Sequence, residues 1–351
     1  MKILLLGGTG AMGVHLGEIL SSRKQNVVIT TRSNRKSQEF IEYRQGNAKN
    51  SEFLDTLLEE KWDVIVDFMV YNENELKERV EKLLNATSQY MFLSSSRVYD
   101  NSVGFIKEET TRLLDTSEDQ KYLATSEYAL TKARQEDILK ASTKQNWTII
   151  RPYITYSEIR LQLGTLEKEN WLYRALKGRT IVFSEDIKNH FTTVTYGLDV
   201  AKAMVTLMNK PNALAQAYHV TSNNSYKWEE LLEVYLDVIE EVLGKRPRVL
   251  FQNMSDFTTW NHGKYQIVYD RLYDRQFDNT KINEFINTSE FTDAKEGLRN
   301  CLKFFMKNPK FNAIGWRNEA IKDKLCKEIT PLSEIFGLKQ KIKYILFRYF
   351  I

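Results

Sequence analysis

Tyr128 and Lys132 stand four residues apart in the stretch SEYALTKARQED. A predicted helix over 126–142 would place both side chains on one face, one turn apart. A phenol titrates at about pH 10, so it acts as an acid or base at neutral pH only when a nearby cation stabilises its phenolate. Lys132 could supply that cation. Because the same spacing occurs on many helix surfaces, its interpretation depends on the rest of the chain.

Three glycines, Gly7, Gly10 and Gly13, are spaced as G-x-x-G-x-x-G between the first predicted strand and the first predicted helix. At such a turn, the missing side chains let backbone N–H groups approach a pyrophosphate at the start of the helix. The order of strand, glycines and helix predicts a dinucleotide site rather than a turn without a ligand. We expect Thr9 and Met12 of the same loop to contact the cofactor as well.

The end of the second predicted strand indicates which dinucleotide is preferred. A carboxylate there would bind the adenosine ribose and exclude a 2′-phosphate, but the segment ITTRSNRK places Thr31 there, followed by Arg32 and Arg35. Cationic side chains at this point favour NADP(H), with NAD(H) as the other cofactor considered. The alternative interpretation is a solvated basic loop.

Hydrophobic patterning predicts the elements that position these residues. Short apolar runs predict strands at 2–7, 26–31, 62–70, 89–96 and 146–152. Polar-apolar segments between them predict helices at 12–23, 51–60, 73–86 and 126–142. Strands this apolar, alternating with helices, indicate a parallel sheet covered on both faces. The predicted fold class is therefore α/β, a doubly wound parallel sheet (Rossmann) with a smaller mixed α/β substrate lobe.

The fourth of these strand runs ends in FLSSSRVYD, at the sheet edge where doubly wound folds bind ligands. With the glycine motif, YALTKARQE, RPYITY and GLDVAKA, it resembles the extended short-chain dehydrogenase/reductases of the nucleotide-sugar epimerase/dehydratase family, over roughly residues 1–308. The resemblance implies that Tyr128 is the acid/base and that Lys132 activates it and binds the nicotinamide ribose. It further implies that Ser95 donates a hydrogen bond to the substrate oxygen, with Ser96 as the nearby alternative.

The chain departs from the family pattern at several positions. Ser96 and Arg97 stand where members that eliminate water place acidic residues, so classical 4,6-dehydration is disfavoured. Ile154 replaces the asparagine usual after the Arg-Pro pair, which makes the sugar pocket non-standard. Asn47 replaces an adenine-side acid and can still hydrogen-bond an amine. The resemblance thus implies an oxidoreductase that moves hydride between nicotinamide and a nucleotide-sugar carbon, as a 4-epimerase or a keto-sugar reductase.

Arg271 and Arg275 lie one helical turn apart in VYDRLYDRQFDNTK. Paired arginines suit the diphosphate of a nucleotide-sugar substrate, which they can bind bidentately. A surface salt-bridge network with the neighbouring aspartates explains them equally well, so both interpretations stay open.

A nonenzymatic dinucleotide-sensing or RNA-binding module on the same fold is the alternative function. The presence of Tyr128, Lys132 and Ser95 favours the enzyme. A net charge of +4 over 351 residues gives no indication of a nucleic-acid partner. With two cysteines and four scattered histidines, no metal site is expected.

Chain length predicts more than one lobe. We expect a dinucleotide-binding domain at 1–150, rejoined by about 187–221, a substrate lobe at 151–308 and a C-terminal extension at 309–351. The apolar start MKILLL ends at GGTG, too early for a signal peptide, and no later run is long enough to span a bilayer. A cytoplasmic location is therefore expected. We separately expect a homodimer.

The segment LKQKIKYILFRYFI predicts an amphipathic helix at the end of the chain. Its apolar stripe comprises Leu338, Ile342, Ile345, Leu346 and Tyr349, and basic residues flank it. Such a stripe is expected to pack on its own protein or on a second subunit. The alternative is an interfacial helix that holds the protein at an anionic membrane.

Overall fold

The chain forms two compact units. The computed structural model describes residues 1–351, apart from the side chain of Ser255. Unit 1 comprises residues 1–157, 193–224 and 276–294. Unit 2 comprises residues 158–192, 225–275 and 295–351.

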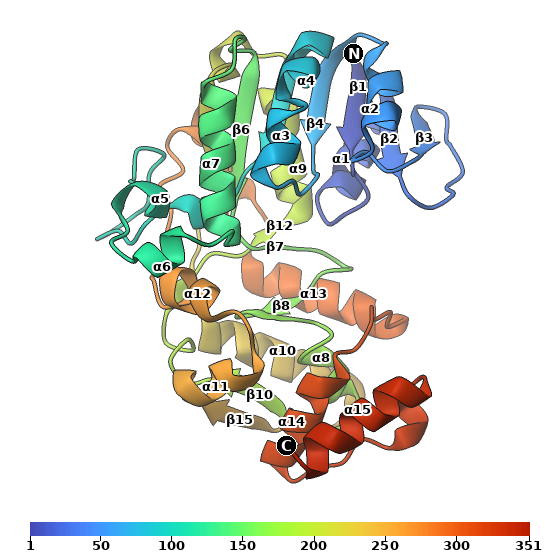
Figure 1. Cartoon of the computed structure of the whole chain (residues 1–351), viewed down its shortest axis with the longest axis vertical. Helices are drawn as coiled ribbons and strands as arrows, with labels where there is room; N and C mark the ends of the chain where they lie inside the picture. The colour runs from blue at the N-terminus through green and yellow to red at the C-terminus, as the bar shows by residue number, and fades with distance from the viewer. The chain divides into compact units, whose positions relative to one another are not determined.

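A seven-stranded parallel sheet forms the centre of unit 1, with the strand order β13-β6-β5-β4-β1-β2-β3 (Figure 1). The strands are β1 (Lys2–Leu6), β2 (Asn26–Thr31), β3 (Ile41–Gln45), β4 (Trp62–Asp67), β5 (Thr87–Leu93), β6 (Trp147–Pro152) and β13 (Gln216–Val220). The chain winds outward from β1 in both directions, which makes the carboxyl edge near β1 and β4 the topological switch point. The predicted doubly wound α/β class is confirmed.

Helices cover both faces of this sheet because successive strand residues point to opposite sides. One core cluster joins Leu5 and its alternating neighbours to α1 (Gly13–Ser22) and α9 (Gly197–Leu207). The other joins Leu4 and its neighbours to four helices: α2 (Ser51–Leu58), α3 (Glu73–Lys77), α4 (Val80–Ala86) and α7 (Tyr128–Lys140). Unit 1 also contains α5 (Leu113–Thr116), α6 (Gln120–Leu123) and the paired strands β7 (Thr155–Tyr156) and β12 (Thr195–Tyr196).

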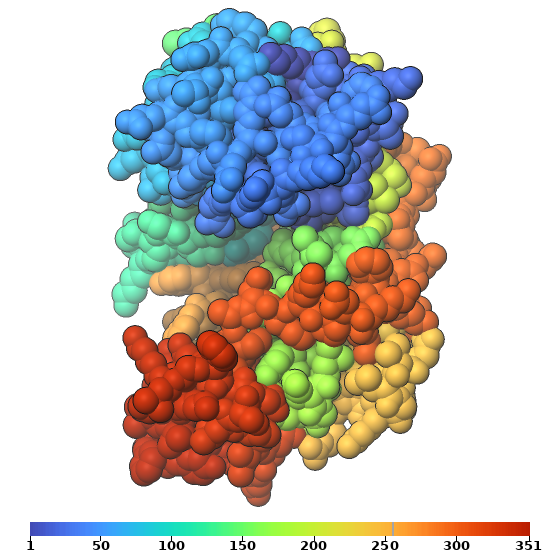
Figure 2. Space-filling model, turned by 90° about the vertical axis from the view of Figure 1, so that its right-hand side faces the viewer, coloured from blue at the N-terminus to red at the C-terminus, as the bar shows by residue number. Residues whose placement is uncertain are grey.

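Unit 2 is mixed α/β, as predicted. Its strand pairs are β8 (Gln162–Leu163) with β9 (Leu166–Glu167), β10 (Ile181–Ser184) with β15 (Val249–Gln252), and β11 (Phe191–Thr192) with β14 (Tyr226–Lys227). Its helices are α8 (Leu172–Leu176), α10 (Trp228–Leu243), α11 (Met254–Trp260), α12 (Lys264–Gln266), α13 (Ala294–Lys307), α14 (Trp316–Cys326) and α15 (Leu338–Tyr349). The first residue of α13, Ala294, belongs to unit 1, and the rest of that helix belongs to unit 2. The C-terminal segment, red in Figure 2, lies at the surface of this unit.

Some boundaries differ from those expected. Residues 276–294 belong to unit 1 rather than to the expected substrate lobe, because Ile282 is fully buried in the core that α1 and α9 share. Residues 309–351 are part of unit 2 rather than a separate extension. The helix predicted at 73–86 is divided into α3 and α4.

Candidate functional site

The glycine loop connects β1 to α1 at the carboxyl edge of the sheet. Gly7 has a φ of +73°, which favours glycine, and its N–H donates to Thr30 Oγ1 at 2.8 Å. At Gly13, a Cβ atom would lie 2.6 Å from the backbone of Gly8, so a larger residue would displace the loop. A Cβ atom at Gly10 would have no described atom within 4 Å. The loop is therefore tight on its inner side and leaves room for a ligand beside Gly10.

The start of α1 suits an anion. Met12 is the N-cap residue and makes no side-chain capping hydrogen bond, and the first turn contains no acidic side chain. The N-terminus of a helix carries partial positive charge and backbone N–H groups without helical partners. Thr9 stabilises the turn of the glycine loop, because its N–H donates to Gly7 O at 2.9 Å. These residues fit the pyrophosphate of a dinucleotide, whose nicotinamide supplies or accepts hydride when bound.

The predicted adenosine-side residues lie together at the ends of β2 and β3. The N–H of Gly46 donates to Thr31 O at 2.8 Å, and Gln45 Nε2 donates to Arg32 O at 3.3 Å. Asn47 follows directly and is exposed. Since β1 pairs with β2, this edge adjoins the glycine loop, where the adenosine end of a dinucleotide would extend.

Arg32 and Arg35 are both exposed in the loop after β2. The Arg35 guanidinium lies 5.8 Å from the centre of the Tyr43 ring. Both arginines are accessible to a 2′-phosphate, and the NADP(H) preference stays a prediction.

Lys132 and Tyr128 occupy the first two turns of α7. The Lys132 side chain is 2% exposed, and its Nζ donates to Leu93 O, at the end of β5, at 2.7 Å. That Nζ lies 6.0 Å from the centre of the Tyr128 ring. Burial lowers the pKa of Lys132 to about 8, although the Asp67 carboxylate opposes this shift. The lysine is therefore fixed beside Tyr128, which is 37% exposed and accessible to a substrate.

The two candidate serines lie in the turn after β5 and differ in their contacts. Ser95 Oγ accepts a hydrogen bond from the N–H of Arg97 at 3.2 Å and caps the short 3₁₀ helix η1 (Ser96–Val98). Ser96 is fully buried, and its Oγ donates to Arg151 O at 2.7 Å. The Ser96 hydroxyl is thus engaged with β6, and Ser95 stays the predicted donor to the substrate oxygen.

Arg97 links the serine turn to the start of α7, a contact that sequence reasoning missed. Its guanidinium pairs with Glu127, the residue before Tyr128, and lies 5.4 Å from the centre of the Tyr128 ring. Tyr128 therefore has two cations near its ring, Arg97 and Lys132, and both would stabilise a phenolate. The sequence signal for this contact was Arg97 itself, a cation at a position where family members that eliminate water carry an acid.

A buried ion pair supports the serine turn. Arg151 Nε and Nη2 donate to the two carboxylate oxygens of Glu136 at 2.8 and 2.7 Å. Ser94 Oγ donates to the same carboxylate at 2.6 Å, and Arg151 Nη1 donates to Tyr99 OH at 2.9 Å. Burial would raise the pKa of Glu136, but the Arg151 guanidinium outweighs it and holds this pKa below its ordinary value. The pair thus connects β6 and α7 to the turn after β5.

Asp67 is a second residue that the sequence analysis missed. It ends β4, and its carboxylate accepts hydrogen bonds from Tyr90 OH at 2.8 Å and from the N–H of Met69 at 2.9 Å. Burial raises the pKa of Asp67, while the nearby Lys132 ammonium opposes that rise. The signal was an acid at the carboxyl end of an apolar strand, in register with Leu6 beside the glycine loop.

Arg271 and Arg275 lie in unit 2, where both bind the carboxylate of Asp270. Arg275 Nε donates to Asp270 at 3.0 Å, and Arg271 Nη1 pairs with the same group. Arg271 Nε also donates to Gly164 O at 3.0 Å. These contacts are buried rather than on the surface, and a diphosphate-binding role stays a prediction.

The parallel sheet with its glycine loop at the switch point, together with the Tyr-x-x-x-Lys helix beside β5, defines a dinucleotide-binding Rossmann protein. Residues 3–221 match the model of the NAD dependent epimerase/dehydratase family. The chain belongs to this family.

One curated relative is the chloroplast stem-loop binding protein of 41 kDa b from Arabidopsis thaliana. It is 24% identical over 249 residues, which cover 66% of this chain and 61% of the relative. The chain thus spans about three fifths of the length of that protein.

Solved structures of epimerases and dehydratases share the fold. An epimerase from Methanothermobacter thermautotrophicus has a TM-score of 0.66 at 17% identity, covering 88% of this chain and 92% of that one. The UDP-glucuronic acid 4-epimerase of Bacillus cereus, in complex with UDP-glucuronic acid and NAD, has a TM-score of 0.65 at 15% identity, covering 88% and 99%. The dTDP-glucose 4,6-dehydratase of Bacillus anthracis, in complex with NAD, has a TM-score of 0.64 at 19% identity, covering 88% and 97%.

Proposed function

We propose that the protein is an NAD(P)-dependent enzyme that transfers hydride between nicotinamide and a carbon of a nucleotide-activated sugar. A 4-epimerase would move the hydride out and back, and a keto-sugar reductase would move it in one direction. The observation that carries the proposal is the pairing of buried Lys132, fixed to Leu93 O, with the accessible phenol of Tyr128 in the family to which the chain belongs.

The side chains would divide the proton chemistry among them. Tyr128 would give a proton to the sugar oxygen, or take one from it, as hydride moves at the attached carbon. Lys132 and Arg97 would lower the cost of the phenolate, because both cations lie near its ring. Ser95 would hold the sugar oxygen with a hydrogen bond, which orients the reacting carbon.

Two features support the choice of ligands. The neighbouring Bacillus cereus structure holds UDP-glucuronic acid and NAD, which supports a nucleotide sugar as the substrate class. Exposed Arg32 and Arg35 after β2 support NADP(H) over NAD(H), since each can pair with a 2′-phosphate. A preference for NADP(H) would in turn favour the reductase direction.

Tyr128→Phe tests the proposal. The nucleotide sugar that copurifies with the protein would be identified by mass spectrometry and used to measure turnover. We expect turnover to fall by about 10²–10⁴-fold, while the cofactor Kd measured by calorimetry changes little, because the hydroxyl acts on the substrate proton. Tyr349→Phe removes a hydroxyl far along the sequence, on α15, and should keep full turnover. Turnover within a few-fold of wild type in Tyr128→Phe would remove this residue from the mechanism.

A second candidate function is stem-loop RNA binding, which the name of the Arabidopsis relative favours. Filter binding with a stem-loop RNA, beside the turnover assay, separates the two. Tight RNA binding without dinucleotide binding or sugar turnover would replace the enzyme with the binding module.

A further inference from the structure

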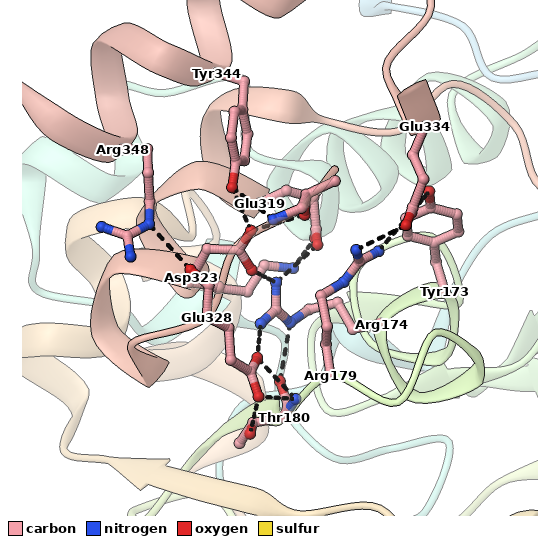
Figure 3. Close-up of polar contacts among 12 residues, drawn as sticks. Tyr173, Arg174, Arg179, Thr180, Glu319, Asp323, Glu328, Glu334, Tyr344 and Arg348 are labelled. Atoms are coloured by element: carbon pink, nitrogen blue, oxygen red, sulfur yellow. Dashed lines mark hydrogen bonds and ion pairs between the residues drawn. The ribbon is translucent and has the colours of Figure 1, made fainter. Parts of the chain in front are cut away.

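Helix α15 docks on unit 2 through one face (Figure 3). Tyr344 is buried, its OH donates to Asp323 Oδ2 at 2.6 Å, and the N–H of Thr330 donates to the same hydroxyl at 2.8 Å. One turn later, Arg348 Nε donates to Glu328 O at 3.0 Å. These hydrogen bonds fix which side of the helix faces its own protein.

The other face of α15 is apolar and exposed. The exposed fractions are 74% for Leu338, 57% for Ile342, 43% for Leu346 and 53% for Tyr349. Phe336 and Phe350, just outside the helix, are exposed as well. Of the predicted stripe, only Ile345 packs on its own protein, against the cluster of Trp316, Ala320, Ile335 and Tyr344. The other four residues are exposed, because the polar contacts of Tyr344 and Arg348 turn that side of the helix outward, and packing on a second subunit stays a prediction.

The acidic residues of the segment 309–351 are all engaged within unit 2. The four acidic residues all bind arginines of unit 2: Glu319, Asp323 and Glu328 bind Arg174, and Glu334 binds Arg179. Residues 335–351 contain no acid, while Lys339, Lys341 and Lys343 flank the apolar stripe. The surface formed by the stripe and these lysines, here called the α15 face, is therefore apolar and positive.

We propose that the α15 face binds an anionic membrane surface. Aliphatic and aromatic side chains of an interfacial helix enter the boundary between headgroups and acyl chains, and flanking lysines contact lipid phosphates. The proposed contact is interfacial, with α15 lying along the membrane surface. In the part of the chain that the structure describes, no helix is both long and apolar enough to cross a bilayer.

The chemistry of the α15 face disfavours two other occupants. Pairing with a second copy would bring lysines of both copies close together, and like charges repel. RNA binding uses phosphate contacts and base stacking on aromatic rings, so exposed Leu338 and Ile342 would gain little from it. Only a surface that is both negative and apolar matches the stripe and its lysines together.

Cosedimentation of the full chain with phosphatidylglycerol vesicles at low salt tests this proposal. We expect binding to these vesicles, weak binding to phosphatidylcholine vesicles, and a decrease with added salt. Each lysine near an anionic surface contributes about fivefold to partitioning, so the triple variant Lys339→Gln/Lys341→Gln/Lys343→Gln should lose on the order of a hundredfold. Ile342→Glu should lose binding too, because it places a carboxylate in the apolar stripe.

Matched controls separate the α15 face from net charge and general hydrophobicity. The triple variant Lys121→Gln/Lys210→Gln/Lys245→Gln removes the same charge from exposed lysines elsewhere, and Phe304→Glu alters an exposed aromatic residue on α13. Both should bind vesicles as the wild type does, and melting temperatures should show that every variant is folded.

Four outcomes would overturn the proposal. The full chain could ignore phosphatidylglycerol vesicles, or the control triple variant could lose as much binding as the α15 variant. Sedimentation velocity could show a dimer that Ile342→Glu dissociates, which would assign the face to a second copy. Binding of a stem-loop RNA could depend on the α15 lysines while vesicle binding does not, which would assign the α15 face to RNA. Vesicle binding is measured without turnover, so its failure would leave the proposed enzyme intact.

Discussion

Each unit buries an arginine among carboxylates, but the two arrangements differ in what they hold. In unit 1, Arg151 binds one carboxylate, Glu136, and the pair supports the turn that carries Ser95. In unit 2, Arg174 donates to three carboxylates from residues 319–328 (Figure 3). The first network supports the candidate catalytic site, and the second fixes the C-terminal helices.

The difference shows two uses of buried charge. Removing charges from water is costly, so a buried arginine is retained only when its partners satisfy it. In unit 1, the ion pair fixes the turn after β5, whose neighbouring strands and helix are already held by two large apolar clusters. Around α14 and α15, the apolar cluster is small, comprising Trp316, Ala320, Ile335 and Tyr344. There the polar network decides the orientation of α15, and with it the exposure of the apolar stripe.

The largest effect is expected from Arg174→Met, which leaves the buried Asp323 carboxylate without its cation, while Glu319 keeps Lys322 and Glu328 keeps Arg248. Breaking a buried ion pair costs about 3–5 kcal/mol in the free energy of unfolding. Urea unfolding would measure this loss, and limited proteolysis would show α15 cleaved first. Arg246→Met is the matched control, because Arg246 also binds three acids, Glu233, Asp237 and Glu240, but on the surface. It should cost less than about 1 kcal/mol, and equal losses would show that burial is not what matters.

Glu136→Gln should cost less than Arg174→Met, about 3 kcal/mol in the free energy of unfolding, because Arg151 keeps its hydrogen bond to Tyr99 OH. Turnover should also fall, since Ser94 loses its carboxylate acceptor and the turn bearing Ser95 shifts. Asp137→Asn alters the next residue on α7, whose carboxylate is half exposed, and should change both quantities little. Unchanged turnover in a folded Glu136→Gln protein would limit the unit 1 network to stability.

A third prediction uses Glu108, a largely buried carboxylate of unit 1 whose pKa is raised by burial to about 7. A raised pKa means that the folded state holds its proton more tightly than the unfolded state, so stability is lost as the pH rises to about 7. Glu108→Gln keeps the protonated shape without titrating. The variant should match the wild type at about pH 5 and exceed it by roughly 2 kcal/mol at about pH 8 in urea unfolding. Parallel pH profiles would show that Glu108 titrates normally.

The smallest effect is expected at Arg32, an arginine that is charged but exposed. Arg32→Asp should shift the ratio of NADP(H) to NAD(H) affinity by about tenfold toward NAD(H), because it replaces a phosphate partner with a repelling carboxylate. Calorimetry with both cofactors measures the ratio. Arg23→Asp makes the same charge change just after α1 and should leave the ratio unchanged. Tighter binding of NAD(H) than NADP(H) by the wild type would identify the loop after β2 as a solvated surface.

Local sequence patterns determined much of the fold and part of the site. The glycine loop, the apolar strands and the Tyr128–Lys132 helix were predicted because each depends on residues within a few positions of one another. The edge strand β3 was missed, since its sequence IEYRQ lacks the apolar run of the central strands. The edge strand β13 was missed as well, because only the last residues of its sequence QAYHV are buried.

Only the tertiary structure decided the contacts between distant segments. Arg97 meets Tyr128 across thirty-one positions, and Arg174 meets Glu319 across 145, separations at which no periodicity links the two residues. The α15 stripe shows the boundary between the two kinds of information. Helical periodicity determined that Leu338, Ile342 and Tyr349 share a face, because 3.6 residues complete each turn. Which face turns toward the protein was decided by the hydrogen bonds of Tyr344 and Arg348, whose partners exist only once the chain has folded.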